Sequence, residues 1–142
     1  MSTNSADEFN EFNRKLVAEF RENGGKVTGM FAGAPLLILT SKGAKSGEPR
    51  INPLVHTRDG ERYVIIASKG GAPTNPAWYH NVVAHPDVTV EVGDERFPAR
   101  AKVVDGEERD RLFAAQAALM PNFAEYQENT TRRIPVVVLE RV

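Results

Sequence analysis

The sequence predicts an α+β fold that is mainly β, a small barrel of about six strands with an N-terminal helix and peripheral helices. Two observations favour this fold class. The predicted strands are short, and Asp59-Gly60 and Gly93-Asp94 are turn signals between neighbouring strands. The predicted helices do not alternate regularly with the strands, as they do in a doubly wound parallel sheet.

The composition predicts a globular protein with one modest core. The chain has 142 residues, of which 41% are hydrophobic and 26% charged, and its formal net charge is −1. This balance gives no overall attraction to nucleic acid or acidic membranes, so we expect no nucleic-acid partner. The absence of cysteine excludes disulfides and thiolate sites. Residues 1–7 lack the pattern of a signal peptide, and we expect a cytoplasmic protein.

The first predicted element is an amphipathic helix from Asp7 to Asn23, ended by Gly24-Gly25. We assign residues 1–25 to this helix and 26–142 to the barrel domain. The helix carries an apolar stripe at helical spacing, formed by Phe9, Phe12, Leu16 and Phe20. The stripe either packs on the domain or contacts a membrane or a neighbour's site. Its polar face is not rich in lysine, which argues against strong membrane binding.

The pattern of apolar residues predicts six strands: Leu36–Thr40, Ile51–Thr57, Arg62–Ser68, Val88–Val92, Arg96–Val104 and Pro135–Glu140. The second and third flank Asp59-Gly60 and are expected to pair as a hairpin. Pro53 indicates an edge or a bulge. The valines of the last strand indicate burial on both faces.

Three further helical segments are predicted. Ala77–Ala84 follows Asn75 as N-cap and Pro76 as first helical residue, and it ends at His85-Pro86. Glu107–Leu119 is capped from about Asp105, and Pro121–Asn129 is a short helical or irregular piece.

Several familiar sites are excluded. Lys45-Ser46 lacks the glycines of a phosphate-binding Walker loop, and neither G-x-G-x-x-G nor G-x-S-x-G occurs. The three histidines, His56, His80 and His85, lie on different predicted elements, so we interpret them as structural or surface residues and predict no metal site.

Two basic glycine-containing loops are the candidate site. Residues 43–47 (GAKSG) present backbone amides, the Ser46 hydroxyl and the Lys45 ammonium, and Arg50 follows. Residues 68–71 (SKGG) repeat this chemistry at the end of the third predicted strand, which the predicted hairpin brings to the same rim. Trp78, the single tryptophan, comes soon after. Each loop alone is more often a solvated turn, but together they predict a pocket for a planar, phosphate-bearing molecule.

Three segments carry a family resemblance: "PLLILTSKGAKSGEPRINPL", "IIASKGGAPTNPAWYHNVVAHPDVTVEVG" and "RRIPVVVLE". In this order they resemble the deazaflavin-dependent nitroreductases of actinobacteria. The resemblance implies an FMN-binding split-barrel-like fold and coenzyme F420, a 5-deazaflavin with a phosphate and a polyglutamate tail. It implies that the phosphate and tail are held by Lys45, Ser46, Gly47 and Arg50, and that the deazaflavin lies along Ser68, Lys69, Gly70, Ala77, Trp78 and Asn81. Lys42 and Pro53 are assigned to the same cofactor site.

The sequence departs from the family pattern in two places. Ala44 stands where the family loop usually has arginine, so that one cation is missing and Lys42 is a candidate to replace it. The segment "MPNFAEY" keeps Tyr126 but has Met120 and Phe123 at two positions where the nitroimidazole-activating member has tyrosines. We therefore expect these three residues to form a more apolar substrate pocket, with inefficient nitroimidazole reduction.

The resemblance implies an oxidoreductase that transfers a hydride from reduced F420 to a quinone, an enone or a nitroaromatic compound. Ser68 and Tyr126 are the candidate catalytic residues: the first as a hydrogen-bond donor, the second as an orienting group or proton source. Two alternatives stay open, an F420 carrier without turnover and a barrel that binds FMN or haem instead. A homodimer and peripheral membrane contact through the N-terminal helix are further expectations.

Overall fold

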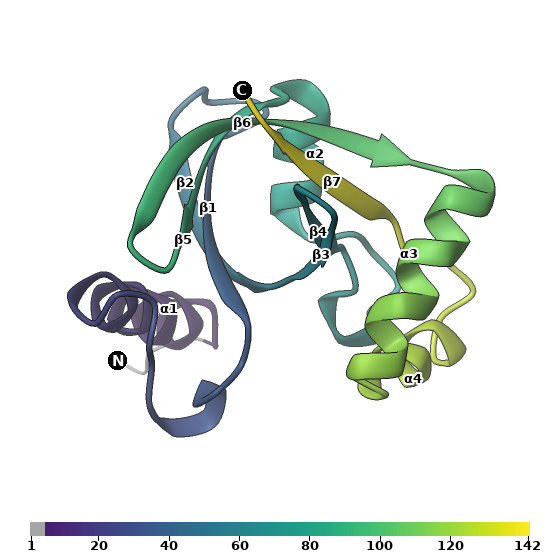
Figure 1. The fold of residues 1–142 in the computed structure, drawn as a ribbon, viewed down its shortest axis with the longest axis horizontal. Helices are drawn as coiled ribbons and strands as arrows, with labels where there is room; N and C mark the ends of the chain where they lie inside the picture. Colours follow the sequence, from purple (N-terminus) through teal and green to yellow (C-terminus); the bar gives the residue numbers. More distant parts are fainter. Residues whose placement is uncertain (1–4) are drawn as a thin grey trace.

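The computed structural model describes residues 5–142, which form one antiparallel seven-stranded sheet flanked by helices (Figure 1). The sheet order is β2-β1-β5-β6-β7-β4-β3. The strands are β1 (Leu36–Lys42), β2 (Pro49–Val55), β3 (Thr57–Asp59), β4 (Arg62–Ile66), β5 (Asp87–Val92), β6 (Glu95–Val104) and β7 (Val136–Arg141). The α-helices are α1 (Ser5–Glu22), α2 (Ala77–Ala84), α3 (Gly106–Leu119) and α4 (Asn122–Glu128), and the short 3₁₀ turns are η1 (Gly29–Phe31) and η2 (Lys69–Gly71).

The closure of the sheet follows from one residue, His56. It alone separates β2 from β3, yet these strands stand at opposite ends of the sheet order. The chain can connect them in this way only if the sheet curls until its two edges approach each other. The small barrel with peripheral helices is therefore confirmed, but the strand number is seven instead of six because His56 divides the predicted strand Ile51–Thr57.

The predicted hairpin between the second and third strands is largely wrong. β2 pairs with β1 along its whole length, from Leu36↔Val55 to Lys42↔Pro49, and only the three residues of β3 pair with β4. An alternating apolar pattern identifies which face of a strand is buried, but it does not identify the neighbouring strand. The turn at Gly93-Asp94 between β5 and β6 is confirmed, with Gly93 at φ +57°.

β7 lies between β6 and β4, and its residues Val136–Leu139 are fully buried, as predicted. Because side chains alternate along a strand, β7 faces two cores. Val137 and Leu139 join the barrel interior, whereas Val136 and Val138 pack with apolar side chains of α3 and α4. The α3–α4 pair thus packs on the face of β7 opposite the barrel interior, beside Val64 and Ile66 of β4 and Val104 of β6.

Helix α1 packs on the outside of β1, so the packing interpretation of its stripe is supported. Leu16 and Phe20 are buried against the strand. Arg21 adds a two-pronged ion pair to the buried carboxylate of Glu91, at 2.9 and 2.8 Å. Phe12 is 43% exposed, and the side chain of Phe9 lies outside the described part of the chain. Among the described helices, none has the length and apolar character to cross a membrane.

The starts of two helices differ from the prediction. Pro76, not Asn75, occupies the N-cap position of α2, and the Asn75 side chain instead accepts a hydrogen bond from Arg132 at 2.6 Å. Asp105 is at the N-cap of α3, but its side chain makes no capping hydrogen bond. Local sequence suggested the caps, but a long-range contact has taken the Asn75 side chain.

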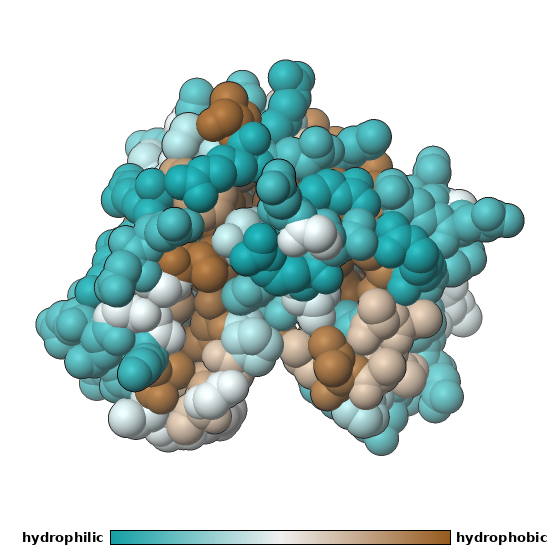
Figure 2. Space-filling view, in the orientation of Figure 1, coloured by the Kyte–Doolittle hydropathy of each residue, from teal (hydrophilic) through white to brown (hydrophobic). Residues whose placement is uncertain are grey.

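The surface of the molecule is divided by a notch. Figure 2 shows this notch between the side that carries α1 and the side that carries α3 and α4, with hydrophobic residues visible on both sides of it. Hydrophilic residues cover most of the surface away from the notch, in the upper part of the same view.

Candidate functional site

The first basic loop connects β1 to β2 and is a tight turn. The Gly43 amide donates to the Glu48 carbonyl, and the Gly47 amide donates to the Gly43 carbonyl, both at 2.8 Å. A Cβ atom at Gly43 would lie 2.6 Å from the Ser46 Oγ, and Gly47 has φ +73°. Gly47 is therefore needed for the shape of the turn, and a side chain at Gly43 would displace the Ser46 hydroxyl.

The loop is fixed to α2 by Asn81. The Ala44 amide donates to the Asn81 Oδ1 at 2.9 Å, and the Asn81 side chain is buried. Asn81 was predicted to line the cofactor site, and the structure gives it a second role as the anchor of the basic loop.

A cavity of about 570 Å³ opens between this loop, β2 and α2. The structure brings together six of the predicted cofactor residues in its lining: Lys45, Ser46, Arg50, Ala77, Trp78 and Asn81. The lining also contains five residues that were not predicted: Gly43, Ala44, Ile51, Asn52 and His80. One spacing signal could have found His80, because residues 77, 80 and 81 lie three and four apart on one face of a helix. Ile51 and Asn52 directly follow Arg50.

The cavity is suited to an anion. Lys45 and Arg50 are exposed cations, and an Arg50 Nη donates to the Ser46 Oγ at 3.3 Å. Among the described residues, the amides of Lys45 and Ser46 have no protein acceptor. Two free amides, two cations and one hydroxyl at the same turn are the donor set of an anion-binding nest. The residues present therefore fit the phosphate and tail of a deazaflavin coenzyme.

Trp78 lines the cavity but is not an exposed stacking surface. It is only 5% exposed, and its indole belongs to the barrel core with Leu39 and Ile65. Ile51, 44% exposed, supplies apolar surface within the cavity instead.

The second basic loop does not line this cavity. Ser68 is buried and leads into η2, where Lys69 has the positive φ of +47° and Gly70 has φ +63°. The Lys69 Nζ donates to the Thr74 Oγ1 at 3.2 Å. A shared hairpin does not place both loops at one rim, because β2 pairs with β1. The loops are instead connected through α2, which follows the second loop in the chain and contacts the first.

η2 lies against α4, which carries the predicted substrate residues. A Cβ atom at Gly71 would come within 2.9 Å of the Tyr126 carbonyl oxygen. Tyr126 is half-buried, and its hydroxyl accepts a hydrogen bond from the Asn122 amide at 2.9 Å. Phe123 is buried against α3, and Met120 is partly buried in the same cluster. The contact between η2 and α4 brings the segments of Ser68 and Tyr126 together.

The remaining predicted residues lie outside the lining of the cavity. Lys42 and Gly47 flank the lined part of the first loop, and Pro53 lies on β2 opposite Ile38. The buried His56 packs on the Tyr63 ring with centroids 5.6 Å apart, and burial lowers its pKa below 6.5. Among the described residues, no cluster of histidine and carboxylate side chains could hold a metal ion.

Known proteins are similar to this chain in sequence and in fold. Residues 12–141 match the F420H(2)-dependent quinone reductase family. An F420H(2)-dependent quinone reductase of Mycobacterium tuberculosis is 43% identical over 128 residues, which cover 87% of this chain and 86% of the relative.

Among solved structures, an F420-H2 dependent reductase named FDR-A is 42% identical, with a TM-score of 0.70 over 75% of this chain and 94% of its own. A structure described as a domain-swapped dimer is 36% identical, with a TM-score of 0.72 over 96% of this chain and 100% of its own. The predicted split-barrel fold and the resemblance to deazaflavin-dependent enzymes are thus confirmed. The chain belongs to the F420H(2)-dependent quinone reductase family.

Proposed function

We propose that the protein is an oxidoreductase that uses reduced coenzyme F420 to reduce a quinone. The observation that carries this proposal is the cavity between the first basic loop and α2, where Lys45, Arg50 and the free amides form a site for an anionic tail. When bound, the reduced deazaflavin supplies a hydride to the acceptor. The chain supplies binding, orientation and exclusion of water.

The cations hold the coenzyme by its charged end. Arg50 already contacts the Ser46 hydroxyl, so the two side chains are placed to bind one phosphate or carboxylate group together. Asn81 keeps the loop against α2, so that the anion site and the wall formed by Ala77 and Trp78 stay in a fixed relation.

We assign the acceptor to the region where η2 meets α4. Because Asn122 donates to the Tyr126 hydroxyl oxygen, the phenolic proton remains available for an acceptor oxygen. The Ser68 hydroxyl is the second candidate donor. The Tyr126 ring packs edge to face on the buried Phe123 ring, with centroids 5.4 Å apart, and the partly buried Tyr126 and Met120 supply the apolar surface. This surface favours a quinone over a more polar nitroimidazole.

The test is oxidation of reduced F420, followed by absorbance, with menadione as the acceptor. We expect acceptor-dependent oxidation, and weaker turnover with a nitroimidazole at equal concentration. Tight binding of F420 without oxidation by any quinone, enone or nitroaromatic compound would instead support a carrier. Preference for FMN in a competition titration would contradict the assignment of the coenzyme.

A homodimer is proposed because one similar structure is described as a domain-swapped dimer. Light scattering after size exclusion would test it, and a monomer at all concentrations would refute it. Of the three stripe residues whose side chains the structure describes, Leu16 and Phe20 are buried and Phe12 is exposed, so Phe12 is the candidate for peripheral membrane contact through α1. Flotation with liposomes of the Phe12→Ser variant and the parent protein tests that contact.

A further inference from the structure

Arg132, in the connection between α4 and β7, joins both ends of residues 67–75, the segment that contains the second basic loop. Its Nε donates to the Ala72 carbonyl at 3.1 Å, and its Nη2 donates to the Ser68 carbonyl at 2.8 Å. Its Nη1 donates to the Ala67 carbonyl at 3.0 Å and to the Asn75 Oδ1 at 2.6 Å. One planar guanidinium group thus holds a nine-residue loop, residues 67–75, at four points.

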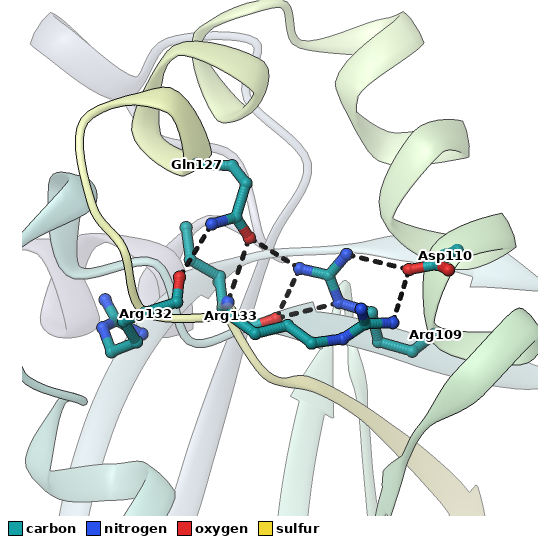
Figure 3. A network of polar contacts seen from close by, with 6 residues as sticks. Arg109, Asp110, Gln127, Arg132 and Arg133 are labelled. Carbon is teal, nitrogen blue, oxygen red and sulfur yellow. Dashed lines mark hydrogen bonds and ion pairs between the residues drawn. The ribbon is translucent and has the colours of Figure 1, made fainter.

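The backbone beside Arg132 is held from the other side. Gln127 of α4 donates from its Nε2 to the Arg132 carbonyl at 2.7 Å, and its Oε1 accepts from the Ile134 amide at 3.0 Å. The buried Arg109 of α3 donates to the same Gln127 oxygen at 2.8 Å and to the Ile134 carbonyl. Figure 3 shows Gln127 between Arg109 and the Arg132 backbone. Arg132 therefore connects residues 67–75 to α4, whose Gln127 binds the Arg132 backbone, and through Gln127 to Arg109 of α3.

The loop has a conformation that its own residues do not favour. Lys69 is the only residue besides glycine, among those described, with a positive φ. A side chain at such a position is disfavoured unless the surroundings impose it. Gly71 adds close contact with the Tyr126 backbone. The position of Ser68 relative to Tyr126 thus depends on contacts from outside the loop.

We propose that Arg132 is a positioning residue, which sets the placement of Ser68 and η2 relative to Tyr126 and thereby the rate of acceptor reduction. This role rests on the proposed function. Arg132 contacts residues 67–75 but not the first basic loop. None of its four acceptors lines the cavity between the first basic loop and α2. Loss of Arg132 therefore changes turnover more than it changes binding of the coenzyme tail.

The experiment compares Arg132→Gln and Arg132→Lys with the control Arg133→Gln. Arg133 is the adjacent residue, 60% exposed in its side chain, and its ion pair is with Asp110 at 2.7 Å. The first readout is hydrogen exchange of residues 67–75 in the protein without coenzyme. We expect exchange to rise by about tenfold or more in Arg132→Gln and to remain unchanged in the control.

The second readout separates turnover from binding. With menadione, kcat of Arg132→Gln should fall by about tenfold or more, while Kd for F420 rises by a smaller factor, because Arg132 does not contact the cations Lys45 and Arg50 that bind the tail. Arg132→Lys should be intermediate, because an ammonium has three donors and lacks the planar fork. Added guanidinium ion should partly restore kcat of Arg132→Gln, but not of a variant that is merely less stable.

The outcomes distinguish the two proposals. If the exchange of the loop is the same in Arg132→Gln and Arg133→Gln, Arg132 does not position it. If exchange rises but kcat stays at the parent value, the loop position is irrelevant to reduction, and the inference is again overturned. If the parent protein reduces no acceptor, the proposed function fails, and the catalytic role of Arg132 fails with it, whatever the exchange shows. If Arg132→Gln does not fold, Arg132→Lys supplies both readouts.

Discussion

Removal of the two cations of the cavity is the sharpest test of the coenzyme site. Lys45→Ala and Arg50→Ala each remove one charge, and the exposed Lys102→Ala on β6 is the control. A hydrogen bond between charged groups contributes about 1.5–3 kcal/mol. Arg50 belongs at the lower end of this range, because its side chain is 49% exposed and lies 3.7 Å from the Glu48 carboxylate. That carboxylate competes with the ligand.

We therefore expect Kd for F420 to rise about tenfold for Arg50→Ala and by about the same factor or more for Lys45→Ala. Because both side chains can contact one anionic group, the factor by which Kd rises in the double variant should be smaller than the product of the two single factors. The effect should shrink as salt increases, since both charges are exposed to solvent. Lys42→Ala should lose less than either, because Lys42 does not line the cavity.

Fluorescence titration of the deazaflavin measures these affinities. The same titration with the deazaflavin ring without its phosphate and tail is the internal control, and its Kd should not depend on Lys45 or Arg50. A double variant that stays folded and binds F420 within about twofold of the parent at low salt would show that Lys45 and Arg50 do not bind the coenzyme.

Three further predictions concern single residues. Ala44→Arg adds a cation to the cavity and should lower Kd for F420 about two- to fivefold in the same titration. The uncharged Ala44→Gln should leave Kd unchanged. Equal effects of the two variants would show that charge is not the cause. Gly71→Ala should lower the free energy of unfolding in urea by at least about 1 kcal/mol more than Gly70→Ala does. Both glycines have a positive φ, but only a Cβ atom at Gly71 would meet the Tyr126 backbone. Equal losses of stability would exclude the contact with Tyr126 as the cause. Burial lowers the pKa of His56 in the folded protein, so the unfolded chain takes up a proton first as the pH falls. The free energy of unfolding should therefore fall as the pH drops below about 6.5. His56→Phe should flatten this dependence, and an unchanged slope would contradict the assignment.

Much of the fold was predictable because it is encoded locally. The stripe of Leu16 and Phe20, the Gly93-Asp94 turn and the valines of β7 each specify an element through its own periodicity or turn residues. The partners of β2 were not predictable in this way. Its residues alternate whichever strand lies beside it, and the break at His56 leaves no mark in the pattern.

The candidate site likewise contains features that local sequence specifies and features that depend on distant contacts. Lys45, Ser46 and Arg50 were found because their chemistry is concentrated in one short segment. Ser68 was predicted in the same way, and its carbonyl accepts a hydrogen bond from Arg132, which lies 64 residues away. A single arginine in a connecting segment has no local signal for such a contact, which becomes visible only in the folded chain.

The place of β7 in the sheet constrains how the chain can fold. β6, which pairs with β7, precedes it by more than thirty residues, and β4, on its other side, by about seventy. Until β7 inserts between them, the β3–β4 hairpin has no hydrogen-bonded link to the rest of the sheet. Insertion of β7 therefore contributes to the barrel interior and to the packing surface of α3 and α4 at the same time. A fragment that ends before Val136 would expose two strand edges and invite pairing with another chain.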